Sequence, residues 1–133
     1  MAISDIPGLS ALRTSMQWHQ QRQRLLAENV SNADTPNYQP RDLVRPTAEA
    51  LTAGVKPGLT MARTNPAHIG FSNGADSGFA LHRKASSETR PTGNAVNLDD
   101  EMLKVATNQM DYQAATSLYT RSLGLLKTAI GRR

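Results

Sequence analysis

The strongest constraint on the fold is a pair of heptad repeats, one near each end of the chain. In such a repeat, seam residues recur at alternating spacings of three and four and line one side of a helix. The first repeat lies in residues 7–31, with seam positions Leu9, Leu12, Met16, His19, Gln23, Leu26 and Val30. The second lies in residues 97–130, with seam positions Leu98, Met102, Val105, Gln109, Tyr112, Thr116, Tyr119, Leu123, Leu126 and Ile130. The pattern predicts a mainly α fold with a long helix at each end.

The residues at the predicted helix starts support this assignment. Pro7 suits a first helical turn, where its missing N–H is not needed. Asn97 is a good N-cap, and Asp99, Asp100 and Glu101 then match the positive end of the helix dipole. We therefore expect the second helix to begin directly after Asn97.

Two heptad helices in one chain are expected to pack against each other as an antiparallel coiled-coil hairpin. Two registers bury every seam position of the first helix. One sets His19 opposite Gln109, and the other, one heptad along, sets His19 opposite Thr116. The sequence leaves both registers open.

Further apolar residues lie off the two seams. On the first helix they are Ala11, Trp18 and Leu25, and on the second they are Leu103, Met110, Leu118 and Leu125. A two-helix hairpin cannot cover them, so we expect neighbouring subunits or partners to do so. The alternative is that the middle of the chain folds over these faces.

The middle of the chain, residues 32–96, is predicted to be rich in loops. Residues 36–93 hold six of the seven prolines and six of the nine glycines, which interrupt regular structure repeatedly. Residues 59–62 and 79–82 have the composition of two short strands that could pair as a β-hairpin, and residues 47–52 could form a helical turn. We treat residues 1–133 as one domain.

A dense group of turn-forming residues follows the first helix. The group comprises Asn29, Asn32, Thr35, Pro36, Asn37 and Tyr38. Pro36 cannot continue a helix, and asparagine tolerates the positive φ that the third position of a turn often requires. We expect residues 35–38 to form a specified β-turn.

Composition and spacing argue against several classes of function. The net charge is +4 and the pI about 9.9, but the basic residues are scattered and form no nucleic-acid-binding motif. There is no cysteine, so disulfides and thiolate chemistry are excluded. No segment approaches the ~20 apolar residues of a membrane span, and residues 1–8 do not resemble a cleaved signal peptide.

No pattern of catalytic or ligand-binding residues is present either. The three histidines show no zinc spacing, and there is no phosphate-binding glycine loop or nucleophile elbow. His19 lies in a helix seam, and we expect it to be packed and hydrogen-bonded. We predict neither an enzyme nor a cofactor, metal or small-molecule substrate.

Residues 29–38, NVSNADTPNY, resemble the N-terminal signature of bacterial flagellar axial proteins. The C-terminal half narrows the resemblance to the FlgB type of basal-body rod protein, on GNAVNLDDEM at 93–102 and NQMDYQA at 108–114. RQRLLAEN at 22–29, RDL at 41–43 and TNPAHI at 64–69 are also similar to this branch. Asn37 stands where the family usually has glycine, and Thr92 where the branch often has aspartate.

The resemblance implies a non-enzymatic subunit of the proximal rod, a shaft that transmits torque. It implies export through the flagellar type III apparatus without a cleaved signal peptide, and assembly in the periplasm. The implied partners are other rod proteins, the membrane-ring protein, the rod–ring adaptor and further copies of this chain. The alternatives are a different flagellar axial subunit and, ranked below it, a basic helical nucleic-acid-binding protein.

Overall fold

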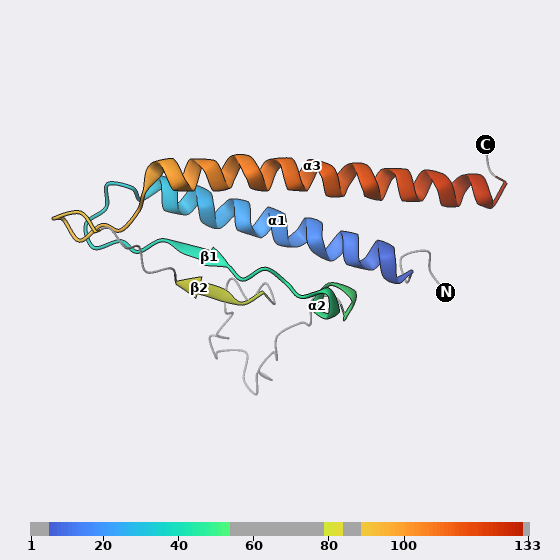
Figure 1. The fold of residues 1–133 in the computed structure, drawn as a ribbon, viewed down its shortest axis with the longest axis horizontal. Coiled ribbons are helices and arrows are strands. Elements are labelled where there is room, and N and C mark those ends of the chain that lie inside the picture. Colours follow the sequence, from blue (N-terminus) through green and yellow to red (C-terminus); the bar gives the residue numbers. More distant parts are fainter. Residues whose placement is uncertain (1–5, 54–78, 84–88, 132–133) are drawn as a thin grey trace, which may run out of the picture.

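A computed structural model describes residues 6–53, 79–83 and 89–131. Along the chain the elements are α1 (Pro7–Ser31), β1 (Arg41–Leu43), α2 (Ala48–Ala53), β2 (Leu81–Arg83) and α3 (Leu98–Ala129) (Figure 1). The mainly helical fold with one long helix near each end is therefore confirmed. Pro7 lies in the first turn of α1, and the Asn97 side chain caps α3 by accepting hydrogen bonds from the backbone N–H groups of Asp99 and Asp100.

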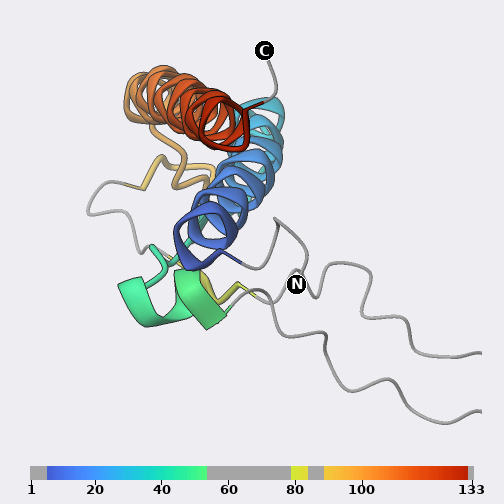
Figure 2. The same cartoon turned by 90° about the vertical axis from the view of Figure 1, so that its right-hand side faces the viewer.

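The two long helices lie side by side and run in opposite directions (Figures 1 and 2). Near one end Asn29 bonds to Glu101, and farther along His19 bonds to Asn108. The register is thus close to the predicted alternative that set His19 opposite Gln109, and the alternative with Thr116 is wrong.

The face of α3 that meets α1 is rotated from the predicted seam. Its buried residues are Glu101, Asn108 and Ala115, spaced seven apart. Six of the ten predicted seam residues of α3 are half-buried, namely Val105, Tyr112, Thr116, Tyr119, Leu123 and Leu126. The prediction is wrong for the other four, because Leu98, Met102, Gln109 and Ile130 are exposed, Met102 by 60% and Ile130 by 65%. The physical cause of the rotation is hydrogen bonding. Glu101 and Asn108 hydrogen-bond to α1 and therefore face it, and their neighbours Met102 and Gln109 are turned toward the surface.

The small sheet differs from the predicted hairpin. β2 overlaps the predicted strand at residues 79–82, but its antiparallel partner is β1, with Leu43 opposite Leu81. The other predicted strand, residues 59–62, lies outside the described residues. β1 was missed because its first two residues, Arg41 and Asp42, are charged, and their ion pairs to α1 hold them in place instead of strand propensity. The predicted helical turn at 47–52 is present as α2.

The middle of the chain covers the off-seam face of α1, contrary to the expectation that other subunits do so. Trp18 is only 3% exposed, and its indole Nε1 donates a hydrogen bond to the Val44 carbonyl at 2.9 Å. α2 packs on α1 on the side away from α3 (Figure 2). The off-seam face of α3, in contrast, is not covered by other described parts of the chain, since Leu103 and Leu125 are 68% and 66% exposed.

Candidate functional site: a polar junction between the helices

The interior where α1 meets α3 is unusually polar. Among the residues that the structure describes, only one of the five largest fully buried side chains is apolar, Leu26, and the others are Asn29, Asn94, Glu101 and Asn108. We call these four residues the polar junction. A buried polar group that lacks a partner is costly, so a cluster of this kind is stable only when each group is satisfied. The contacts of the four residues meet that condition.

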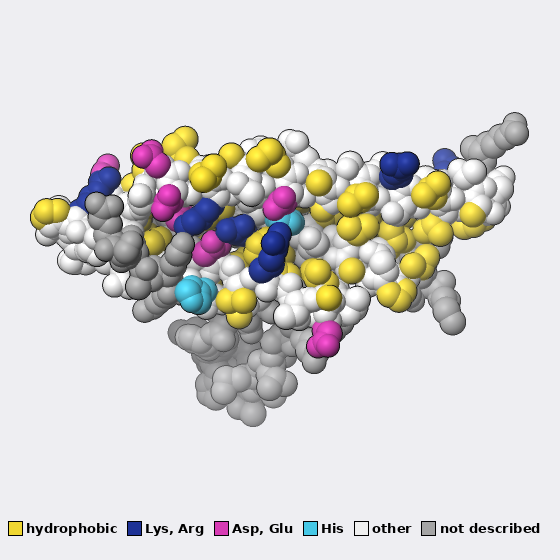
Figure 3. Space-filling model, viewed as in Figure 1, with side chains coloured by type: hydrophobic (Ala, Val, Ile, Leu, Met, Phe, Trp, Pro, Cys, Tyr) yellow, Lys and Arg dark blue, Asp and Glu magenta, His cyan; other side chains and the backbone are white. Residues whose placement is uncertain are grey.

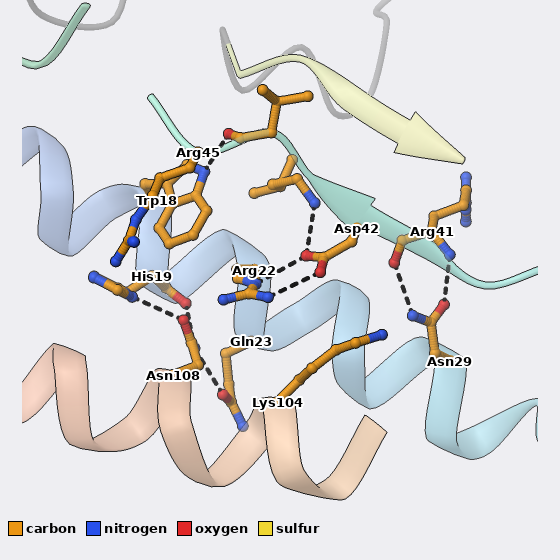
Figure 4. A network of polar contacts seen from close by, with 12 residues as sticks. Trp18, His19, Arg22, Gln23, Asn29, Arg41, Asp42, Arg45, Lys104 and Asn108 are labelled. Atoms are coloured by element: carbon orange, nitrogen blue, oxygen red, sulfur yellow. Dashed lines mark hydrogen bonds and ion pairs between the residues drawn. The ribbon is translucent and has the colours of Figure 1, made fainter. Parts of the chain in front are cut away.

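Asn29, near the end of α1, uses the full capacity of its amide, and Figure 4 shows its two bonds to the backbone of Arg41. Its Nδ2 donates to the Arg41 carbonyl at 2.7 Å and to Glu101 Oε2 at 2.9 Å. Its Oδ1 accepts from the Arg41 N–H at 3.1 Å and from the Tyr38 hydroxyl at 3.2 Å. A primary amide has two donors and two acceptor sites. One side chain therefore joins α1, the turn, β1 and α3.

Glu101 lies in the first turn of α3, where the sequence suggested only charge matched to the helix dipole. The structure gives it a second role, since its carboxylate accepts from Asn29 and is paired with Lys104 one turn along. Arg41, in turn, is paired with Glu28 on α1. Asn29 therefore lies between two ion pairs, Glu101–Lys104 on α3 and Arg41–Glu28 between β1 and α1.

Asn108, on α3, also uses its side-chain amide to join the two helices. Its Nδ2 donates to the His19 carbonyl at 3.0 Å and to Gln23 Oε1 at 2.9 Å. Its Oδ1 therefore faces His19 Nδ1, at 2.8 Å, and the ring N–H is the donor in that bond. The prediction that His19 is a packed, hydrogen-bonded residue is confirmed. These three bonds set the register of the two helices.

Asn94 holds the chain that leads into α3 against the turn that leaves α1. Its Nδ2 donates to the carbonyls of Asn32 and Thr35, at 3.0 and 2.7 Å. Its Oδ1 accepts from the Val96 N–H at 2.8 Å. The backbones are also joined, since Asn37 N–H bonds to the Thr92 carbonyl and Ala95 N–H to the Tyr38 carbonyl. The turn and the start of α3 form one unit.

The predicted turn at residues 35–38 has the expected conformation. The Tyr38 N–H reaches the Thr35 carbonyl at 3.4 Å, and Asn37 adopts φ +58°, the left-handed region that glycine usually occupies. The Asn37 side chain then occupies space beside Gly93, which itself has φ +77°. A Cβ on Gly93 would lie 2.1 Å from Asn37 Oδ1, so Asn37 fits only because residue 93 is glycine.

A bidentate ion pair fastens β1 to α1. Arg22 Nε and Nη2 donate to the two carboxylate oxygens of Asp42 at 2.8 and 2.9 Å. Burial alone raises the pKa of Asp42, but the hydrogen bonds and charge of Arg22 outweigh it, and the net pKa is lowered. The guanidinium also lies 5.2 Å from the centre of the Trp18 ring, a cation–π distance.

The predicted residues of the turn are brought together, whereas the predicted assembly residues are spread along the hairpin. Asn29, Asn32, Thr35 and Tyr38 all contact one another or Asn94. Sequence reasoning missed Asn94, Glu101 and Asn108 as junction residues. The signal was available, because all three lie in the C-terminal stretches that carry the family resemblance.

The site offers hydrogen bonds and ion pairs that hold segments together. Across residues 6–53, 79–83 and 89–131, no three His, Cys, Asp or Glu side chains are grouped as a metal site would require. Among the helices in these ranges, none combines the length and the apolar character needed to cross a membrane.

Comparison with known proteins gives the family. No family model matches the chain. A protein named flagellar basal body rod protein FlgB from Agrobacterium fabrum (strain C58) is 34% identical over 104 residues, covering 77% of this chain and 76% of the relative. FlgB from Proteus mirabilis is 35% identical over 70% of this chain and 71% of the relative, and FlgB from Bacillus subtilis is 28% identical over 82% and 81%. The chain therefore belongs to the FlgB family of flagellar basal body rod proteins.

Proposed function

We propose that this chain is a non-enzymatic structural subunit of the proximal rod of the flagellar basal body. The observation that carries the proposal is the family membership, together with a large apolar surface on α3 that the chain does not cover itself. A subunit of a shaft needs surfaces that only neighbours cover, and exposed apolar patches commonly mark such contacts. The shaft would transmit torque through these contacts.

In this proposal residues 1–133 act as one rod-type domain, with α1 and α3 as a coiled-coil hairpin. The support comes from burial, since Leu9 and Leu26 are buried and Leu12, Met16 and Val30 are half-buried. These side chains would stabilise the hairpin itself. Among the residues predicted for assembly, Leu98, Met102 and Ile130 are exposed and remain available for neighbours. Leu123 and Leu126 are half-buried, so each could contribute both to the hairpin and to a contact with a neighbour.

The polar junction suits a part under mechanical load. Three buried asparagines bind α1, the turn and the start of α3 through hydrogen bonds that require defined geometry. Force applied to the middle of the chain would pass through the junction into both helices. We expect the turn to fix how the middle segment leaves the shaft.

The proposed partners are other rod proteins, the membrane-ring protein, the rod–ring adaptor and copies of this chain. The proposed route is export by the flagellar type III apparatus without a cleaved signal peptide, and the proposed location is the periplasmic rod. The names of the relatives support the rod location.

The test is complementation of a strain that lacks the gene. Leu125→Asp places a charge on the exposed face of α3 and is expected to abolish rods and motility while export of the chain continues. Thr120→Asp, another exposed position on the same helix, is the matched control and is expected to swim. Rods in the strain without the gene, or normal motility with Leu125→Asp, would contradict the proposal.

A further inference from the structure

The outer face of α3 carries a straight stripe of exposed residues. From one end it comprises Leu103, Thr107, Met110, Ala114, Leu118, Arg121 and Leu125, and all seven are exposed. Leu103, Ala114 and Leu125 are eleven residues apart, which is close to a whole number of helical turns, so the stripe barely winds around the helix. Figure 3 shows apolar side chains at the surface along the length of α3.

The large apolar residues of the stripe are placed symmetrically about Ala114. Leu103 and Leu125 lie eleven residues on either side of Ala114, and Met110 and Leu118 lie four residues on either side. Thr107 and Arg121 are the one unlike pair, at seven residues on either side. When two copies of such a stripe run antiparallel, large apolar residues meet large apolar residues, and the small Ala114 meets itself at the centre.

We propose that the free chain forms an antiparallel homodimer through this stripe, with a twofold axis at Ala114. A twofold interface is isologous, so one self-complementary patch is sufficient for it. The small side chain at the axis allows the helices to approach closely, and Leu103 of each copy packs on Leu125 of its partner. The stripe is about 33 Å long at 1.5 Å per residue.

Charge favours the same orientation. The first half of α3 carries four acidic residues (Asp99, Asp100, Glu101 and Asp111) and one basic residue, Lys104, whereas its second half carries only the basic Arg121 and Lys127. An antiparallel pair sets the acidic part of one copy beside the basic part of the other, and a parallel pair would set like charges together. This selects a second copy of the chain, in one orientation, as the occupant.

The inference goes beyond the proposed function and does not depend on it. An isologous pair closes on itself and cannot extend a shaft, so the dimer would be a form of the free subunit that hides the stripe. Assembly would then require the two copies to separate.

Single-cysteine variants of the full chain test the geometry, because the natural sequence has no cysteine. Ala114→Cys places both thiols at the axis, and we expect a covalent dimer under mild oxidation. Leu103→Cys, also exposed, is the matched control, because its two thiols would lie about 33 Å apart. We expect Ala114→Cys to crosslink at least ~10-fold faster. An equimolar mixture of Leu103→Cys and Leu125→Cys should give the mixed disulfide.

Equal crosslinking of Ala114→Cys and Leu103→Cys would overturn the proposal, as would faster self-crosslinking of Leu103→Cys.

A second measurement, sedimentation, needs no oxidation. The natural chain should sediment at twice its 14.4 kDa mass at high concentration, and Ala114→Glu, which opposes two carboxylates at the axis, should remain at 14.4 kDa. At concentrations where both chains are monomeric, the two melting temperatures should agree. A natural chain that is monomeric at every concentration would exclude the dimer, while rod assembly in cells would still test the proposed function separately.

Discussion

The two ends of the α1–α3 pair are built in opposite ways. At the junction end, polar side chains are buried, and the amides of Asn29, Asn94 and Asn108 are engaged within the chain. Toward the C-terminal end of α3, apolar side chains such as Leu118, Leu125 and Ile130 are exposed. Burial of apolar surface is the main source of stability in proteins. The comparison indicates that the chain completes the junction by itself, whereas it leaves the apolar side chains in the far half of α3 uncovered.

The largest effect is expected at the centre of the junction. Asn29→Ala removes four hydrogen bonds and leaves backbone groups of Arg41 and one oxygen of Glu101 buried without this partner. We expect a loss of about 3–5 kcal/mol in the free energy of unfolding, measured with urea. Gln113→Ala, on the exposed side of α3, is the control and should stay within about 0.5 kcal/mol. A small effect of Asn29→Ala would mean that the junction does not hold the hairpin.

The next effect concerns the contact between the turn and Gly93. In Gly93→Ala the new Cβ would clash with the Asn37 side chain, and alanine would have to adopt the left-handed conformation of residue 93. We therefore expect a loss of about 2–3 kcal/mol in the free energy of unfolding. Replacing Asn37 by glycine in the same chain removes the clash and should restore about 1 kcal/mol or more. Strictly additive effects of the two substitutions would show that the residues are not coupled.

A smaller effect is expected at the Arg22–Asp42 ion pair. Asp42→Asn should cost about 1–3 kcal/mol near neutral pH, because a mostly buried arginine loses its charged partner. The folded pKa of Asp42 is lowered, so its contribution is present above the pKa of the unfolded chain and is lost as the pH falls through the folded pKa. Urea titrations at a series of acidic pH values should show a shallower pH dependence for Asp42→Asn. Parallel curves for the two proteins would contradict this.

The smallest effect has the opposite sign and lies in the far half of α3. A Cβ on Gly124 would meet no atom within 4 Å, so Gly124→Ala should raise the free energy of unfolding by about 0.5–1 kcal/mol through helix propensity. Thermal unfolding of the two proteins checks the sign. A destabilised Gly124→Ala chain would show that residue 124 is already packed against something in the free protein.

The sequence predicted the elements better than their contacts. Heptad spacing, Pro7 and Asn97 indicated the two helices, and Pro36 with Asn37 indicated the turn, because these signals are local. For the face of α3 that meets α1, six of the ten predicted seam residues are half-buried, but Met102 and Gln109 were predicted in place of their buried neighbours Glu101 and Asn108. Periodicity favours apolar Met102 over polar Glu101, and the hydrogen bonds that reverse this preference come from residues more than seventy positions away.

The burial of Trp18 was missed for a related reason. Its cover comes from Val44 and the charged strand β1, which carry no apolar pattern. Arg22 and Asp42 position this strand through an ion pair between residues twenty apart, and a scan for periodicity does not detect such a pair. The junction residues Asn94 and Asn108 could be found from family resemblance, whereas their roles required the structure.

The central claim is that the chain completes its junction and leaves the far half of α3 for a partner. Native-state hydrogen exchange, at concentrations where the chain is monomeric, measures this residue by residue. The account predicts that amides near Asn29 and from Glu101 to Asn108 exchange only through global unfolding, and that protection falls steadily from Leu118 toward Ala129. Uniform protection along the whole of α3, or a junction that exchanges faster than its far half, would contradict the account.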